Sequence, residues 1–322
     1  MSFLVWYWQE TVRITVGTFQ YTAPYGAPAL LGALLFASLH YYDKRRRAGR
    51  KADVQDFVKS VFSERILWHP SSRIDMRLWA LNTLVFAAGY GLLAAGGILW
   101  RDATISGLTQ LFGAHTPTSW PIWTILALAT VLELLAYEFG YWSSHYIFHL
   151  VPALWEFHKV HHSAEVLTTF TEMRTHPVEI ISFMNVIALF TGIVFGVMTY
   201  AFGPGVHPFT LLHGNIVLMG FLVTIGHLRH SHMWIPFKGW AGKLFQSPAH
   251  HQIHHSINPK HFNRNLGFAL AVFDWAFGTL YLPQKRERIV FGVGAQHADF
   301  AGVARNYVMP FVKAWAALKK PA

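Results

Sequence analysis

The chain has 322 residues, of which 53% are apolar, 16% aromatic and only 13% charged, whereas a soluble globular domain carries roughly 25% charged residues. This composition excludes both an ordinary soluble domain and a disordered chain, and the lack of cysteine excludes disulfides, iron–sulfur clusters and thiolate-ligated haem or zinc. The formal net charge of +10, in a membrane protein, indicates contact with anionic lipid headgroups rather than with nucleic acid.

Five apolar stretches are long enough to cross a bilayer, which takes about 20 mostly apolar residues. They cover residues 21–42, 78–100, a stretch that begins near 121, 177–202 and 208–227. The sequence therefore predicts an all-α fold, a polytopic membrane bundle of about five spanning helices with a cytoplasmic, histidine-rich metal-binding cap. The segment 56–68 fits either an interfacial helix or a solvated loop. The first residues lack the basic region of a cleavable signal, so we expect none.

Basic residues predict the orientation. The loop between the first two stretches holds 10 of the 26 lysines and arginines, and the segment KRRRAGRK at 44–51 contains six of them. The positive-inside rule places this loop in the cytoplasm, and with five spans the C-terminal third lies there too. The alanine- and tryptophan-rich composition favours a bacterial inner membrane. The terminal Lys319 and Lys320 leave the endoplasmic reticulum as the alternative.

Four histidine clusters fall on the predicted cytoplasmic side. They are His145 and His149, then His158, His161 and His162, then His227, His230 and His232, and finally His251, His254 and His255. Residues three or four apart share one face of a helix, so HxxxH and HxxHH direct two or three imidazoles to one point. Together the clusters offer more ligands than one metal ion can hold, which predicts a two-metal site.

The residues alone leave the chemistry open. Imidazole binds iron, zinc, copper and nickel, and the absence of a Glu-x-x-His pair argues against a ferritin-like carboxylate site. Two irons with open positions would activate O₂, and the bilayer would provide an apolar substrate. A histidine-based metal-binding or transport protein and a zinc-dependent membrane lipid hydrolase remain as alternatives.

The order HxxxH, HxxHH, HxxHH resembles the fatty acid hydroxylase and sterol desaturase superfamily. Further matches are RTHPVE at 174–179, LRHSH at 228–232, SPAHHQIHHS at 247–256 and FDWAFGTLY at 273–281, so that the resemblance covers roughly residues 138–282. It implies a membrane-bound, non-haem di-iron oxygenase that hydroxylates or desaturates a fatty acyl chain, a sterol, a carotenoid or an ether lipid. Tyr146 stands where many members have arginine, which weakens any transfer of the substrate class.

The resemblance also implies the site residues. Carried over by position, the metal ligands are His145, His149, His158, His161, His162, His230, His251, His254 and His255, with His227 as a tenth candidate and His176 as a tentative one. The implied cofactors are two iron ions, which zinc can replace in purified protein, with O₂ as the co-substrate. Glu138, two helical turns before His145, and Asp274 are candidates for orienting the histidines.

These expectations divide the chain into three parts. Residues 1–120 would form the N-terminal membrane helices and basic loop, 121–282 the di-metal catalytic domain and 283–322 a cytoplasmic or interfacial tail. We find no flavin, haem or ferredoxin motif, so we expect a separate electron donor, either a ferredoxin, a cytochrome b5-like protein or a reductase. The other expected partners are a lipid substrate and the membrane, and no nucleic acid.

Overall fold

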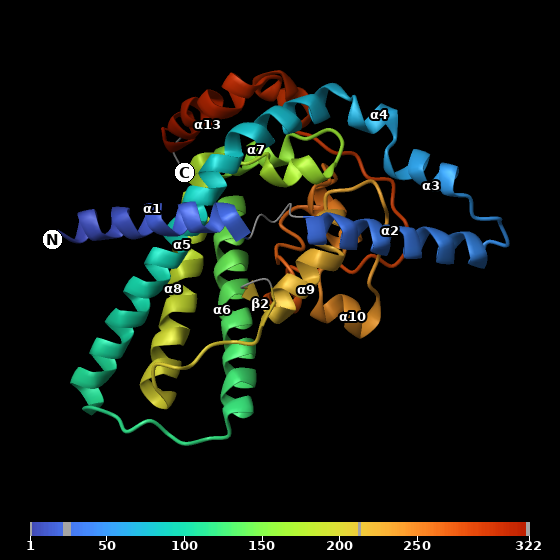
Figure 1. Cartoon of the computed structure of the whole chain (residues 1–322). Coiled ribbons are helices and arrows are strands. Elements are labelled where there is room, and N and C mark those ends of the chain that lie inside the picture. Colours follow the sequence, from blue (N-terminus) through green and yellow to red (C-terminus); the bar gives the residue numbers. More distant parts are fainter. Residues whose placement is uncertain (1, 22–26, 212–213, 320–322) are drawn as a thin grey trace. The chain divides into compact units, whose positions relative to one another are not determined.

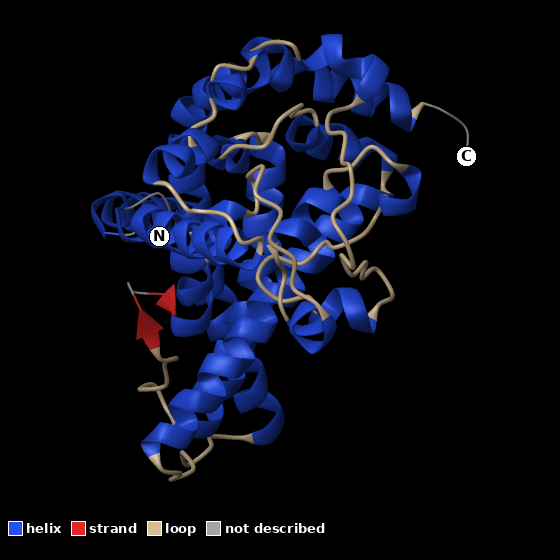
Figure 2. Cartoon of the chain, turned by 90° about the vertical axis from the view of Figure 1, so that its right-hand side faces the viewer, coloured by secondary structure: helices blue, strands red, loops and turns tan. Residues whose placement is uncertain are grey.

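The computed structural model describes residues 2–21, 27–211 and 214–319, and helices dominate this part of the chain (Figure 1). The predicted all-α class is confirmed, since the strands in the described ranges are only β1 (Thr210–Leu211) and β2 (Gly214–Asn215), one short antiparallel pair (Figure 2). The chain divides into two compact units. The bundle unit comprises Met1–Pro24, Leu84–Ser144 and Ile180–Gly220, and the histidine unit comprises Tyr25–Thr83, His145–Glu179 and Phe221–Ala322.

The helices follow one another with short connections. In chain order they are α1 (Phe3–Tyr21), α2 (Ala27–Arg47), α3 (Val54–Val61), α4 (Glu64–Leu67), α5 (Pro70–Phe112), α6 (Ile122–Leu150), α7 (Pro152–His162), η1 (Thr169–Met173), α8 (Pro177–Phe202), α9 (Ile216–Thr224), η2 (Gly226–Leu228), α10 (Gly239–Leu244), α11 (Pro248–His254), η3 (Pro259–His261), α12 (Val272–Ala276), η4 (Gly294–Phe300) and α13 (Val303–Leu318). The segment left open as helix or loop is helical in α3 and α4, and α3 begins where the Asp53 carboxylate accepts hydrogen bonds from the backbone N–H groups of Gln55 and Asp56.

Within the described residues, three helices are long and apolar enough to span a membrane: α5, α6 and α8. They correspond to the second, third and fourth predicted spans. The first predicted span overlaps α2, which ends in four consecutive basic residues, and residues 22–26 of that span lie outside the described part of the chain.

The fifth predicted span is not one helix. Its apolar run begins in the β1–β2 pair and continues in α9, whose nine residues extend only about 14 Å, against roughly 30 Å of hydrocarbon. The run then passes into the 3₁₀ turn η2. The prediction of about five spanning helices is therefore not confirmed, because hydropathy detects an apolar run but not the turns that interrupt a helix.

Close backbone contact shapes the bundle unit. A Cβ atom at Gly192 of α8 would lie 2.6 Å from the Cβ of Trp100, and one at Gly196 would lie 2.5 Å from the Cβ of Thr104, both on α5. Such distances leave no room for a side chain, and this Gly-x-x-x-Gly spacing is one by which membrane helices approach closely. On another side of α8, Phe190 packs edge-on against Phe139 of α6, with ring centroids 4.8 Å apart. Helix α8 is thus held between α5 and α6.

Alanine substitution at two glycines should separate packing from helix propensity. We expect Gly196→Ala to lower the free energy of unfolding by about 1–3 kcal/mol, because its methyl group overlaps α5. Gly107→Ala, on α5, should instead raise it by roughly 0.5–1 kcal/mol, because a Cβ at this position would have no neighbouring atom within 4 Å. Thermal unfolding in detergent measures both. Equal shifts of the two midpoints would contradict this packing.

Candidate metal centre

Nine of the predicted histidine ligands converge in the histidine unit. Within each of two groups, one ring nitrogen of every residue lies within 4.8 Å of those of the others. The five-histidine group contains His145, His149, His158, His162 and His254, and the four-histidine group contains His161, His230, His251 and His255. The groups adjoin, because the rings of His162 and His255 stack with centroids 4.6 Å apart.

Helical spacing explains how each HxxHH motif serves both groups. In α7, His158 and His162 lie four residues apart and belong to the five-histidine group, whereas His161 belongs to the other. The motif of α11 does the reverse, and only its middle residue, His254, joins the five-histidine group. Helix α7, and α11 with the residue that follows it, therefore each contribute imidazoles to both groups.

Hydrogen bonds to the outer ring nitrogens fix how these rings are oriented. The contacts are His145 Nδ1 to the Leu266 carbonyl at 2.7 Å, His254 Nδ1 to the Arg264 carbonyl at 2.9 Å, His161 Nδ1 to the Arg174 carbonyl at 3.3 Å, His158 Nδ1 to Glu179 Oε1 at 2.8 Å and His230 Nδ1 to Glu172 Oε2 at 3.2 Å. A carbonyl oxygen only accepts, so Nδ1 of His145, His161 and His254 carries the proton. Nε2 of these neutral rings then carries a lone pair, as a metal ligand must.

The inner nitrogens are packed in a way that a cation would stabilise. Nε2 of His161 and Nε2 of His230 lie 3.1 Å apart, and the Nδ1 atom of each ring donates to an oxygen. Two lone pairs at this distance repel each other. A proton on His251, whose Nε2 lies 2.7 Å from that of His230, could satisfy only one of them. Ligands bound at about 2.0–2.1 Å to one ion at right angles lie about 3 Å apart, so the donors fit a metal ion.

Two glutamates hold histidines in place, and sequence reasoning assigned neither of them this role. Glu172 bonds His230 and also pairs with Arg229 at 2.8 Å, and Glu179 bonds His158. Partial burial favours the neutral acid, but the Arg229 and His230 side chains hold the pKa of Glu172 well below its usual range. Glu172 is thus an ionised acceptor. Glu179 could have been singled out as the acid of the RTHPVE segment, whereas nothing local marked Glu172.

Arg174 links α7 to α5 through a buried ion pair. Its Nη1 lies 2.7 Å from Asp75 Oδ1, and both side chains are at most 1% exposed. Its Nε also donates to the Val160 carbonyl and to Ser163 Oγ at the C-terminal end of α7. Because its own carbonyl accepts from His161, Arg174 positions both the helix that carries three histidines and one ring directly.

Asp274 acts on the site through the backbone. Its carboxylate accepts hydrogen bonds from the N–H groups of Leu266 and Gly267 and from the Thr279 hydroxyl, at 2.6–2.9 Å. The Leu266 carbonyl in turn accepts from His145. Asp274 thus organises the turn whose Leu266 carbonyl bonds this histidine, and its role in orienting a metal ligand stays a prediction.

Three further candidates lie outside both groups. His176 Nδ1 accepts from the Val178 N–H at the start of α8, and its Nε2 donates to the Tyr307 carbonyl of α13, so both of its nitrogens bond the backbone. His227 is buried in η2, but it belongs to neither group. Glu138 is fully buried in the part of α6 that belongs to the bundle unit, and its predicted role stays a prediction.

Burial sets the protonation of the ligands that lie outside the candidate spans. It lowers the pKa of His158, His161, His162, His251 and His255 well below the usual range, and that of His254 to about 4. These imidazoles are therefore neutral near pH 7, which is the form that binds metals.

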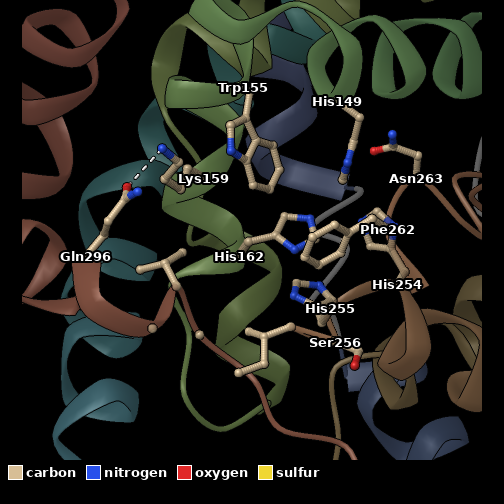
Figure 3. A pocket seen from close by; sticks show the side chains of 14 residues that line it. His149, Trp155, Lys159, His162, His254, His255, Ser256, Phe262, Asn263 and Gln296 are labelled. Carbon is tan, nitrogen blue, oxygen red and sulfur yellow. Dashed lines mark hydrogen bonds between the residues drawn. The ribbon is translucent and has the colours of Figure 1, made fainter. Parts of the chain in front are cut away.

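A cavity of about 480 Å³ opens beside the histidines (Figure 3). His149, His162 and His254 of the five-histidine group line it, together with Trp155 and Phe262. Its volume lies in the range of small-molecule sites, and its aromatic walls suit an apolar ligand. A substrate carbon in this cavity would lie next to the metal ligands.

Comparison with known proteins points to lipid-modifying enzymes. Residues 130–279 match a family model described as fatty acid hydroxylase. Alkylglycerol monooxygenase of Xenopus tropicalis is 28% identical over 76% of this chain and 49% of its own length. Ornithine lipid hydroxylase OlsE of Rhizobium tropici is 25% identical over 71% of this chain and 64% of its own length. Delta(7)-sterol 5(6)-desaturase erg3C of Aspergillus fumigatus is 24% identical over 70% and 69%.

This chain thus spans about half to two thirds of the length of the first two relatives. No solved structure matches it.

Removing one acceptor of a histidine N–H should weaken metal binding. We expect Glu172→Ala and Glu179→Ala each to lower metal affinity by about 10–100-fold, because partners of this kind orient the ring and raise its basicity. Glu165→Ala is the matched control, since Glu165 lies 3.2 Å from a histidine, His297, that belongs to neither group. Metal content after dialysis against a chelator series measures the effect. Equal retention in all three variants would show that these contacts do not support the site.

Proposed function

We propose that this chain, whose residues 130–279 match the fatty acid hydroxylase model, is a membrane-bound, non-haem di-iron oxygenase of the fatty acid hydroxylase and sterol desaturase superfamily. It would hydroxylate or desaturate an unactivated C–H position of a lipid with O₂ and external electrons. The observation that carries this proposal is the convergence of nine imidazoles in two adjoining groups beside a cavity with aromatic walls.

The donor set supports two iron ions. All nine donors are nitrogens, a set that iron and zinc both accept, so zinc can occupy the site during expression. When bound, the irons would supply O₂ activation. Hydroxylation balances as R–H, O₂, two electrons and two protons giving R–OH and water, and desaturation gives an alkene and two waters from the same reactants. Zinc cannot exchange electrons, so only iron supports this chemistry.

The chain's own residues hold the donors and shape the substrate site. Leu266, Arg264 and Arg174 fix three rings through their carbonyls. Trp155 and Phe262 would exclude water from the substrate carbon, which matters because a dry site limits side reactions of a strong oxidant. The catalytic domain that we propose covers residues 121–282.

Charge supports the proposed location and partners. The basic segment 44–51 and the nine histidines belong to the same compact unit, which favours an active site on the cytoplasmic face. The net charge of +10 favours docking of an acidic electron carrier, such as a ferredoxin or a cytochrome b5-like protein. We propose the bacterial inner membrane as the location.

Metal content and oxygen consumption together test this function. We expect iron-57-grown, detergent-purified protein to hold two nitrogen-ligated irons per chain by Mössbauer spectroscopy and to consume O₂ in step with lipid product. His161→Ala should lose iron and all turnover, because it removes one of four donors from its group. His115→Ala, an exposed histidine outside both groups, should keep both. Full turnover by His161→Ala would refute the site, and turnover without O₂ or reductant would favour a hydrolase instead.

A further inference from the structure

The cavity beside the five-histidine group differs in character from one side to the other. Trp155, His162 and Phe262 turn toward the same space, with Lys159 and Gln296 on one side of it and Asn263 on the other (Figure 3). Apart from the histidines, Lys159 is the ionisable side chain among the described residues that line this cavity. The state of this lysine therefore decides the charge that the non-histidine side chains of the cavity wall present to a lipid, in addition to that of any bound metal.

Lys159 is already paired. Its Nζ lies 2.6 Å from both carboxylate oxygens of Glu156, one turn earlier on α7, and donates to Gln296 Oε1 at 3.0 Å. The lysine side chain is 6% exposed and the glutamate 14%, so solvent weakens this pair little. A buried cation with its own carboxylate has little charge left with which to hold a carboxylate or phosphate ligand.

Gln296 offers the cavity a neutral hydrogen-bond donor next to this ion pair. Its oxygen accepts from Lys159 at 3.0 Å and from Lys313 at 3.3 Å, which leaves its amide nitrogen to donate to another group. Asn263 adds a second amide on the far side. Its backbone has φ +58°, a left-handed conformation that asparagine adopts more readily than most residues other than glycine. The two amides match ether, hydroxyl or amide oxygens.

Resting on the proposed function, we infer that this cavity is the lipid site and that it selects uncharged lipids over anionic ones. The apolar chain lies between Trp155 and Phe262, and an ether, hydroxyl or amide oxygen near the reacting carbon accepts from Gln296 or Asn263. The pairing of Lys159 with Glu156 is the specificity device, because an unpaired lysine here would favour fatty acid anions and phospholipids.

Photolabelling tests this selectivity without turnover. The probes are a diazirine-bearing monoalkylglycerol and a fatty acid with the same chain and diazirine position, used on detergent-purified protein without reductant. We expect the alkylglycerol to label the cavity, at peptides that contain Trp155 or Phe262, about tenfold more than the fatty acid, which corresponds to ~1.4 kcal/mol. Equal labelling of the cavity by both probes, or labelling only elsewhere, would overturn the inference.

Charge variants make the test sharper. Glu156→Gln should shift the preference toward the fatty acid by about tenfold, because it leaves Lys159 without its carboxylate. Glu156→Gln combined with Lys159→Met should restore the preference for alkylglycerol, which separates charge from damage to the fold. Gln296→Leu should reduce alkylglycerol labelling alone. Glu10→Gln is the matched control, since Glu10 pairs with Arg13 at the same i,i+3 spacing and the same 2.6 Å distance on α1.

The outcomes distinguish the two proposals. Selective labelling that follows the Glu156 variants, in a protein that never consumes O₂ with lipid, would leave the lipid site standing and refute the oxygenase. O₂-dependent lipid turnover with labelling that ignores Glu156 and Gln296 would do the opposite.

Discussion

The structure depends on one electrostatic constraint, namely that imidazole lone pairs face one another in a buried site. His161 and His230 each donate a hydrogen bond from the outer nitrogen, Nδ1, to an oxygen. Their inner nitrogens, Nε2, are then unprotonated and lie 3.1 Å apart. Desolvation keeps the neighbouring rings neutral, so protonation cannot relieve the repulsion at neutral pH. A metal ion relieves it. Folding of the histidine unit and metal binding should therefore be coupled, as in other sites whose ligands converge only in the folded state.

This constraint explains why buried charges surround the histidines. A lone carboxylate or guanidinium in such an environment is costly, and the two buried arginines beside the histidines are each paired with a carboxylate. Arg174 pairs with Asp75, and Arg229 pairs with Glu172. Breaking a buried pair typically costs about 3–5 kcal/mol, which is a large part of the stability of a domain. These pairs therefore help to hold the segments that carry the histidines.

Sequence reasoning predicted the donors but missed the two glutamates that hold His158 and His230. HxxxH and HxxHH are local patterns, so eight of the nine candidate donors follow from helical spacing, whereas His230 followed only from the resemblance. Glu172 meets His230 across 58 residues and Glu179 meets His158 across 21, and no local period encodes such contacts. The fold was predictable to the same extent. The composition indicated the helical membrane class. The apolar run that contains α9 was predicted to be a span because hydropathy does not register the strand at Gly214 and Asn215 before α9 or the 3₁₀ turn η2 after it.

The distribution of charge separates attachment to a membrane from the choice of substrate. The chain carries a net charge of +10, much of it in the segment 44–51, and such a field attracts anionic headgroups and acidic proteins over several ångströms. At the cavity the charge of Lys159 is neutralised, because Glu156 lies 2.6 Å away. An unpaired lysine there would draw anions toward the site, where they would compete with a neutral lipid. The Lys159–Glu156 pair thus separates two effects of positive charge: the basic surface attracts the protein to the membrane, while the paired lysine does not favour anionic substrates in the cavity.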